Sequence, residues 1–116
     1  MNADEYRRAR RRKVSDTIQV VDTMTDTVVG RLSNLSETGM LLIASVPLAD
    51  DALYQFRFTL DSRGRAHTIE VGAHLLWQDP ASATGQVWTG FRFINVADHQ
   101  LQYLQQWLQA PGGTFE

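Results

Sequence analysis

Cysteine is absent from this chain of 116 residues, and lysine occurs once, at Lys13. The absence of cysteine excludes a disulfide framework, a thiol nucleophile and a cysteine metal site. No stretch approaches the roughly 20 apolar residues of a membrane helix, so we expect no membrane insertion. The first residues are charged from Asp4 onward, so we expect no secretory signal. We therefore expect a cytoplasmic protein.

Residue patterns typical of catalysis are also missing. No G-x-S-x-G, P-loop or H-E-x-x-H motif occurs, and none of the three histidines has a second ligand at metal spacing. His67 and His74 lie in one predicted strand at odd spacing, so their side chains are predicted on opposite faces. The sequence predicts no enzyme, no metal site and no cofactor.

Positive charge is scarce outside one short segment. Residues 7–13, RRARRRK, hold six of the eleven basic residues; residues 14–116 have five basic against eleven acidic residues, a net charge of about −6. A segment this polar cannot bury apolar area, so residues 1–13 are predicted to be a flexible basic arm when nothing is bound. From these residues alone the arm is either a solvated tail or an anion-binding segment. Because the rest of the chain is acidic, we expect no nucleic-acid partner and a small anion at most.

Hydrophobic periodicity predicts a mainly β domain over residues 14–110. Short β-branched and aromatic runs alternate with turns, whereas residues 97–109 carry leucines at helical spacing. The Pro-Gly-Gly sequence at 111–113 is predicted to end the helix and to leave 111–116 as a frayed tail. This pattern favours a small six-stranded antiparallel β-barrel with a C-terminal α-helix. The predicted strands cover residues 18–22, 27–32, 40–44, 53–60, 67–77 and 87–94.

A second polar segment stands out between two predicted strands, residues 34–39, NLSETG. Asn34 offers hydrogen-bond donors and an acceptor, Ser36 adds a hydroxyl, and Gly39 permits a positive φ or a close backbone approach. Each of these residue types is also common in ordinary loops. The segment is more informative alongside the arginine arm than by itself.

These two segments, in this order, resemble the paired motif of PilZ domains, which are bacterial receptors for cyclic di-GMP. In that family an Arg-x-x-x-Arg motif precedes an Asp/Asn-x-Ser-x-x-Gly motif by about twenty residues, as it does here. The sequence LLW at 75–77, TGFRF at 89–93 and the terminal helix are also similar. The resemblance extends from Glu5 to Leu108.

The resemblance implies roles for particular residues. The arginines would bind phosphates and the Hoogsteen edge of guanine, which suits the forked geometry of arginine. Asn34 would read guanine, and Ser36 and Gly39 would bring the loop against the ligand. Trp77, at a predicted strand end, is either a core residue or a wall that contacts guanine. The ligand is a compact dianion, which the family often binds as a stacked dimer.

Two arginine registers satisfy the motif spacing, Arg7 with Arg11 and Arg8 with Arg12. We favour the first, because in the family an apolar strand residue commonly follows the second arginine by three positions, as Val14 follows Arg11.

The resemblance further implies a non-catalytic receptor whose arm becomes ordered over the ligand. The signal would then pass to an unidentified downstream protein. The alternative is a PilZ-like adaptor that binds no ligand and acts only through protein contacts.

Overall fold

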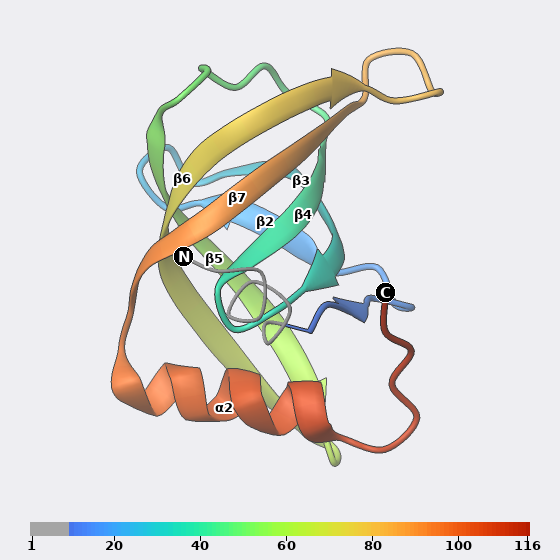
Figure 1. The fold of residues 1–116 in the computed structure, drawn as a ribbon. Coiled ribbons are helices and arrows are strands. Elements are labelled where there is room, and N and C mark those ends of the chain that lie inside the picture. The colour runs from blue at the N-terminus through green and yellow to red at the C-terminus, as the bar shows by residue number, and fades with distance from the viewer. Residues whose placement is uncertain (1–9) are drawn as a thin grey trace, which may run out of the picture.

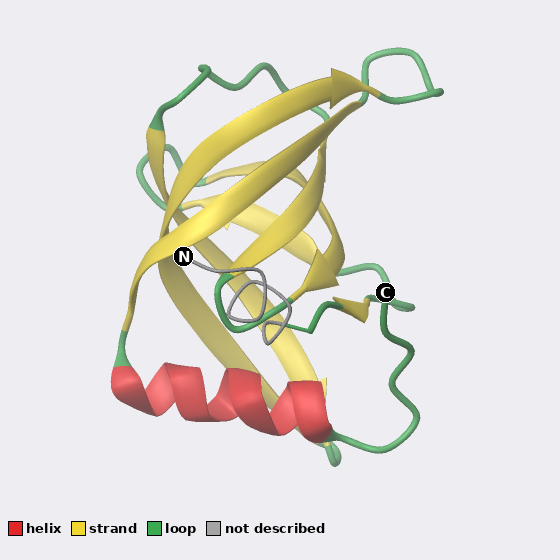
Figure 2. Ribbon diagram, in the orientation of Figure 1, coloured by secondary structure: helices red, strands yellow, loops and turns green. Residues whose placement is uncertain are grey.

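The structure, a computed structural model, describes residues 10–116. Six antiparallel strands close into a barrel in the order β2-β3-β4-β7-β6-β5. Helix α2 (Asp98–Gln109) lies across one end of the barrel (Figure 1). Figure 2 shows this division into a strand barrel and a C-terminal helix. The predicted fold class is thus confirmed. The elements are β1 (Arg12–Lys13), β2 (Gln19–Asp22), β3 (Thr27–Leu35), β4 (Gly39–Ala44), β5 (Leu53–Ser62), β6 (Arg65–Pro80), β7 (Val87–Val96) and α2 (Asp98–Gln109).

The core lies inside the barrel and under the helix. On β5 the residues at period two, Phe56, Phe58 and Leu60, are at most 2% exposed, as the alternating pattern predicts. Helix α2 adds Leu104 and Trp107, its buried residues. Burial of each such side chain stabilises the fold by about 1.5–3 kcal/mol, so the helix is held mainly by its apolar face.

Strand β3 is longer than its sequence pattern predicts. Its last residues, Asn34 and Leu35, pair with β1 on one side and with β4 on the other. These two partners supply the backbone hydrogen bonds that keep the strand extended beyond Leu32. Asn34 therefore belongs to a strand, and the connection to β4 is only three residues long.

The boundaries of the barrel also differ from those expected. The sequence assigned residues 1–13 to the arm and 111–116 to a frayed tail. In the structure Arg12 and Lys13 already form β1, and Phe115 makes an antiparallel bridge to Arg12. The two ends of the described range therefore lie side by side.

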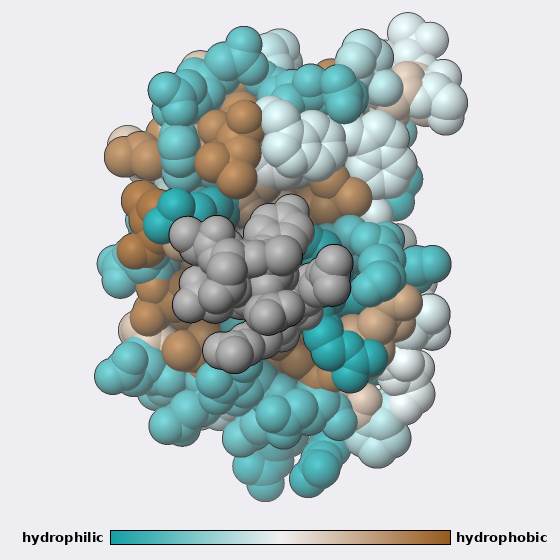
Figure 3. Space-filling model, viewed as in Figure 1, coloured by the Kyte–Doolittle hydropathy of each residue, from teal (hydrophilic) through white to brown (hydrophobic). Residues whose placement is uncertain are grey.

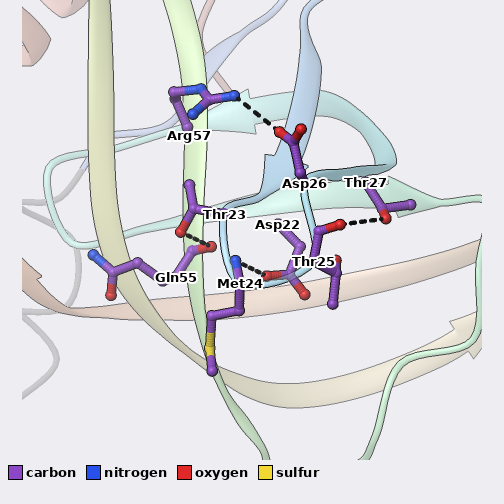
Figure 4. A network of polar contacts seen from close by, with 8 residues as sticks. All are labelled: Asp22, Thr23, Met24, Thr25, Asp26, Thr27, Gln55 and Arg57. Atoms are coloured by element: carbon purple, nitrogen blue, oxygen red, sulfur yellow. Dashed lines mark hydrogen bonds and ion pairs between the residues drawn. The ribbon is translucent and has the colours of Figure 1, made fainter.

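A polar network fixes the turn between β2 and β3 (Figure 4). Asp22 is 7% exposed, and its Oδ1 accepts a hydrogen bond of 2.9 Å from the N–H of Met24. Asp26 has φ of 54° and lies 3.7 Å from Arg57 of β5 in an exposed ion pair. Such a pair contributes about 0–1 kcal/mol, so the buried carboxylate is the main polar anchor of the turn.

Candidate ligand-binding site

Ser36 shapes the connection between β3 and β4. Its side chain is fully buried, and Oγ accepts hydrogen bonds of 3.2 Å from the N–H groups of Thr38 and Gly39. The hydroxyl donates back to the carbonyl of Gly39 at 3.3 Å. Since this hydroxyl is engaged within the loop, Ser36 acts by holding the loop in shape.

Gly39 allows the same loop to sit directly on β7. A Cβ at this position would lie 2.2 Å from the carbonyl oxygen of Phe91, which is backbone and cannot move aside cheaply. The carbonyl of Thr38 accepts the N–H of Phe93 at 2.8 Å. A glycine is thus required here for close approach of two strands.

Asn34 is the buried polar centre of this region. Its side chain is 1% exposed, and its two ends have different partners. Oδ1 accepts a hydrogen bond of 3.1 Å from the guanidinium of Arg11, and Nδ2 donates one of 2.8 Å to a carboxylate oxygen of Glu116. The structure therefore brings a residue of the first predicted motif onto a residue of the second.

The neighbouring arginine points elsewhere, because successive side chains of an extended segment face opposite sides. The guanidinium of Arg12 donates to the carbonyls of Trp107 and Ala110, the latter at 3.0 Å, and stands 4.7 Å from the Trp107 ring centroid. Helix α2 has no basic residue of its own in its last turn. Arg12 supplies the missing cation at the negative end of the helix dipole.

A row of cross-strand neighbours runs over the outer face of the barrel from Asn34. In register, Asn34 of β3 pairs with Leu41 of β4, Leu41 with Gly90 of β7, and Gly90 with Trp77 of β6. A Cβ on Gly90 would lie 2.1 Å from Nε1 of Trp77, so the indole covers the glycine. Trp77 is 45% exposed and lies outside the core. We call these four residues the outer row.

Arg92 lies beside the outer row and was missed by the sequence reasoning. It pairs in register with Gly39 and is exposed, between Phe91 and Phe93, which pack on the core. The signal was available, because Arg92 alternates with these two aromatic residues on one strand. It places a cation next to the Ser36–Gly39 loop.

Several barrel strands carry exposed apolar side chains. Figure 3 shows exposed apolar side chains over the barrel strands, whereas the surface over α2 is hydrophilic. The large exposed apolar residues on β5, β6 and β7 are Leu53, Leu76, Trp77 and Ile94.

The structure thus brings some of the predicted site residues together and leaves others apart. Arg11 contacts Asn34, while Ser36 and Gly39 form the loop that follows it. Arg12 faces the helix end. Arg7 and Arg8 lie outside the described residues, so the register of the first motif stays a prediction.

Residues 5–110 match the family model of the PilZ domain. The chain belongs to the PilZ domain family. No curated protein matches it significantly.

Solved structures with a similar fold include other PilZ proteins. The inhibitor of motility MotI/DgrA of Bacillus subtilis has a TM-score of 0.71 at 12% identity, over 87% of this chain and 48% of that one. The PilZ domain of YcgR from Escherichia coli with c-di-GMP has a TM-score of 0.62 at 18% identity, over 85% and 86%. The longer YcgR complex with c-di-GMP has 0.63 at 20% identity, over 84% and 42%. This PilZ chain therefore spans about half the length of MotI and of the longer YcgR chain.

Two histidines of this PilZ domain, His67 and His74, take part in packing and surface contacts. His67 stacks on Tyr103 of α2 with ring centroids 3.8 Å apart, and His74 bonds to Asp51 on the outer side. Within residues 10–116 no group of three potential ligands is placed to hold a metal ion. Over the same range, no helix has the length and apolar character needed to cross a bilayer.

Proposed function

We propose that this PilZ domain is a non-catalytic receptor for cyclic di-GMP in the cytoplasm. It binds the ligand on the outer face of the barrel, between the arginine arm and the Ser36–Gly39 loop. Binding orders the arm, through Arg7 and Arg11, over the ligand, and the change is passed to a partner protein.

The hydrogen bond between Arg11 and Asn34 carries this proposal. The two residues come from different motifs, 23 positions apart, and meet at one end of the outer row. The likeness to the YcgR domain that holds c-di-GMP supports the ligand class.

The side chains on the outer face of the barrel suit cyclic di-GMP, a dianion with two guanines. The amide of Asn34 can donate to and accept from a guanine edge, and the guanidinium of Arg11 can fork onto guanine O6 and N7 or onto phosphate. Trp77 offers a flat aromatic surface on which a base can stack. Arg92 adds an exposed cation for phosphate beside the loop.

Isothermal titration calorimetry tests the proposal directly. Cyclic di-GMP is expected to bind, whereas cyclic AMP and single-stranded DNA are expected not to bind at the same concentrations. Affinity should fall as salt rises, because phosphate contacts are screened. An absence of heat with cyclic di-GMP at every salt concentration would contradict the receptor function and favour the ligand-independent adaptor. The molar ratio of ligand to protein at the midpoint of the titration also distinguishes one bound molecule from a stacked dimer.

A further inference from the structure

The last residues of the sequence, Thr114–Glu116, lie along β1 on the edge opposite β3. The carbonyl of Thr114 accepts the N–H of Lys13 at 2.8 Å, and the N–H of Glu116 donates to the carbonyl of Arg11 at 2.9 Å. Phe115 makes the antiparallel bridge to β1. We call these three residues the strap.

The side chains of the strap occupy two groups of the first and second motifs. The carboxylate of Glu116 accepts the hydrogen bond of Asn34 Nδ2 at 2.8 Å. The ring of Phe115 lies under the guanidinium of Arg10, 4.1 Å from its carbon to the ring centroid. The strap thus offers an acceptor to the asparagine and a flat π face to an arginine, which are the contacts that a purine base makes with such residues.

In this structure the strap occupies the amide that a ligand binding Asn34 would need. Asn34 is 1% exposed, so a ligand atom reaches its side chain only after a covering group has moved away. Glu116 is a suitable group to move, because it is itself exposed and follows two glycines. Its negative charge also repels a dianionic ligand at short range.

Resting on the proposed receptor function, we propose that the strap is an autoinhibitory pseudo-ligand, which cyclic di-GMP displaces from Asn34 on binding. Displacement would free Phe115 and Glu116 from β1 together, since both are neighbouring residues of the strap and its backbone bonds to β1 flank them. Arg12 would stay on the end of α2, because its partners are helix carbonyls. Binding would thereby convert an ordered segment into a released one beside the arm.

The measured affinity equals the intrinsic affinity multiplied by the fraction of molecules in which the strap is open. Glu116→Ala removes the acceptor and is expected to tighten cyclic di-GMP binding about tenfold, as one charge-assisted hydrogen bond implies. Glu116→Gln keeps an acceptor oxygen and loses the charge, so its gain is expected to be smaller, about threefold. The control is Asp79→Asn, which removes one exposed carboxylate from the β6–β7 hairpin and should leave the affinity within about twofold.

A second background separates competition for Asn34 from a general charge effect. In the Asn34→Ala variant the strap has lost its partner, so adding Glu116→Ala should bring no further gain. An equal gain in both backgrounds would show that Glu116 acts only by long-range repulsion and would overturn the proposal.

Heteronuclear NOE measurements follow the strap itself. Without ligand, residues 114–116 of the wild type are expected to be as ordered as the barrel, and the strap of Glu116→Ala less so. Saturating cyclic di-GMP should lower the values at 115 and 116 in the wild type. A wild type that binds while the strap stays ordered, and whose affinity Glu116→Ala does not change, overturns the strap proposal and leaves the receptor function standing. If no variant binds cyclic di-GMP, both proposals fail.

Discussion

Two buried polar side chains at different places on the barrel are held in contrasting ways. Asp22, 7% exposed, accepts a hydrogen bond from a backbone N–H two residues later (Figure 4). Asn34, 1% exposed, has its side chain held by Arg11 and Glu116, which lie 23 and 82 positions away. The hydrogen bond of Asp22 is local to its turn, whereas those of Asn34 depend on two charged side chains from the ends of the described range.

The difference separates a structural polar group from one suited to binding. The partner of Asp22 is fixed as soon as the turn forms, so the group can be satisfied only in one way. The partners of Asn34 are long charged side chains that can be exchanged for groups of a ligand with similar geometry. A buried polar group must form hydrogen bonds, so it selects a ligand that offers the right donors and acceptors. Because its present partners are flexible side chains, they can be exchanged for the ligand.

Removing Asn34 should have the largest effect on binding. Asn34→Ala is expected to weaken cyclic di-GMP binding by about 1–3 kcal/mol, because the ligand loses its hydrogen bonds to the buried amide of Asn34. If the strap competes, the release of Glu116 by the same change offsets part of the loss. Stability should change little, because Arg11 and Glu116 can turn to water. Calorimetry and thermal unfolding measure the two effects separately.

Ser36→Ala should lower both the affinity for cyclic di-GMP and the free energy of unfolding. Its hydroxyl accepts from two backbone N–H groups that the change would leave without a partner, at about 1–3 kcal/mol of unfolding free energy. Affinity should fall because the loop beside Asn34 loses its shape. Unchanged affinity in both folded variants, Asn34→Ala and Ser36→Ala, would remove the loop from the binding site.

Removing Asp22 should give the opposite pattern to Asn34. Asp22→Ala is expected to lower the free energy of unfolding by about 1–2 kcal/mol, since the turn loses its buried acceptor. Asp22→Asn keeps an oxygen for the N–H of Met24 and should recover most of that stability. Both variants should bind cyclic di-GMP like the wild type. A loss of affinity without a loss of stability in Asp22→Ala would erase the distinction between the two regions.

The adjacent arginines offer the next comparison. Arg11→Ala and Arg7→Ala should each weaken binding at least about tenfold, because each loses a charge-assisted hydrogen bond to the ligand. Arg12→Ala should instead lower stability by about 1 kcal/mol, through its contacts with the end of α2, and change affinity less than twofold. Titration and chemical unfolding of all three variants test this. Normal binding by Arg7→Ala and Arg11→Ala, together with failure of Arg8→Ala and Arg12→Ala, would establish the other register.

Much of the fold follows from short-range patterns. The alternation of Phe56, Phe58 and Leu60 predicts β5, and the leucines of α2 predict the helix, because each pattern reflects one buried face. The strand position of Asn34 was not predictable, since its pairing partners come from β1 and β4. The contact of Glu116 with Asn34 has no local signal either, as it joins residues 82 positions apart.

Trp77 shows the limit of periodicity within one strand. Strict alternation puts it on the same face as Leu75, which is 1% exposed and inside the core. The pairing of β6 with β7 shifts between these two residues, and this irregularity turns Trp77 to the outer face above Gly90. Such a shift is set by the neighbouring strand, so the sequence of β6 alone left both roles of Trp77 open.

The smallest expected effect concerns this tryptophan. If Trp77 is a wall of the site, cyclic di-GMP should change the tryptophan fluorescence, and Trp77→Phe should abolish most of that change. Affinity should fall only about twofold to threefold, because phenylalanine keeps part of the stacking surface. The matched controls are Trp88→Phe and Trp107→Phe, which should keep the response; Trp107 is 7% exposed beneath Arg12. A response that survives in Trp77→Phe and disappears in Trp107→Phe would mean that the signal comes from the β1 and α2 contact, and that Trp77 serves only to cover Gly90.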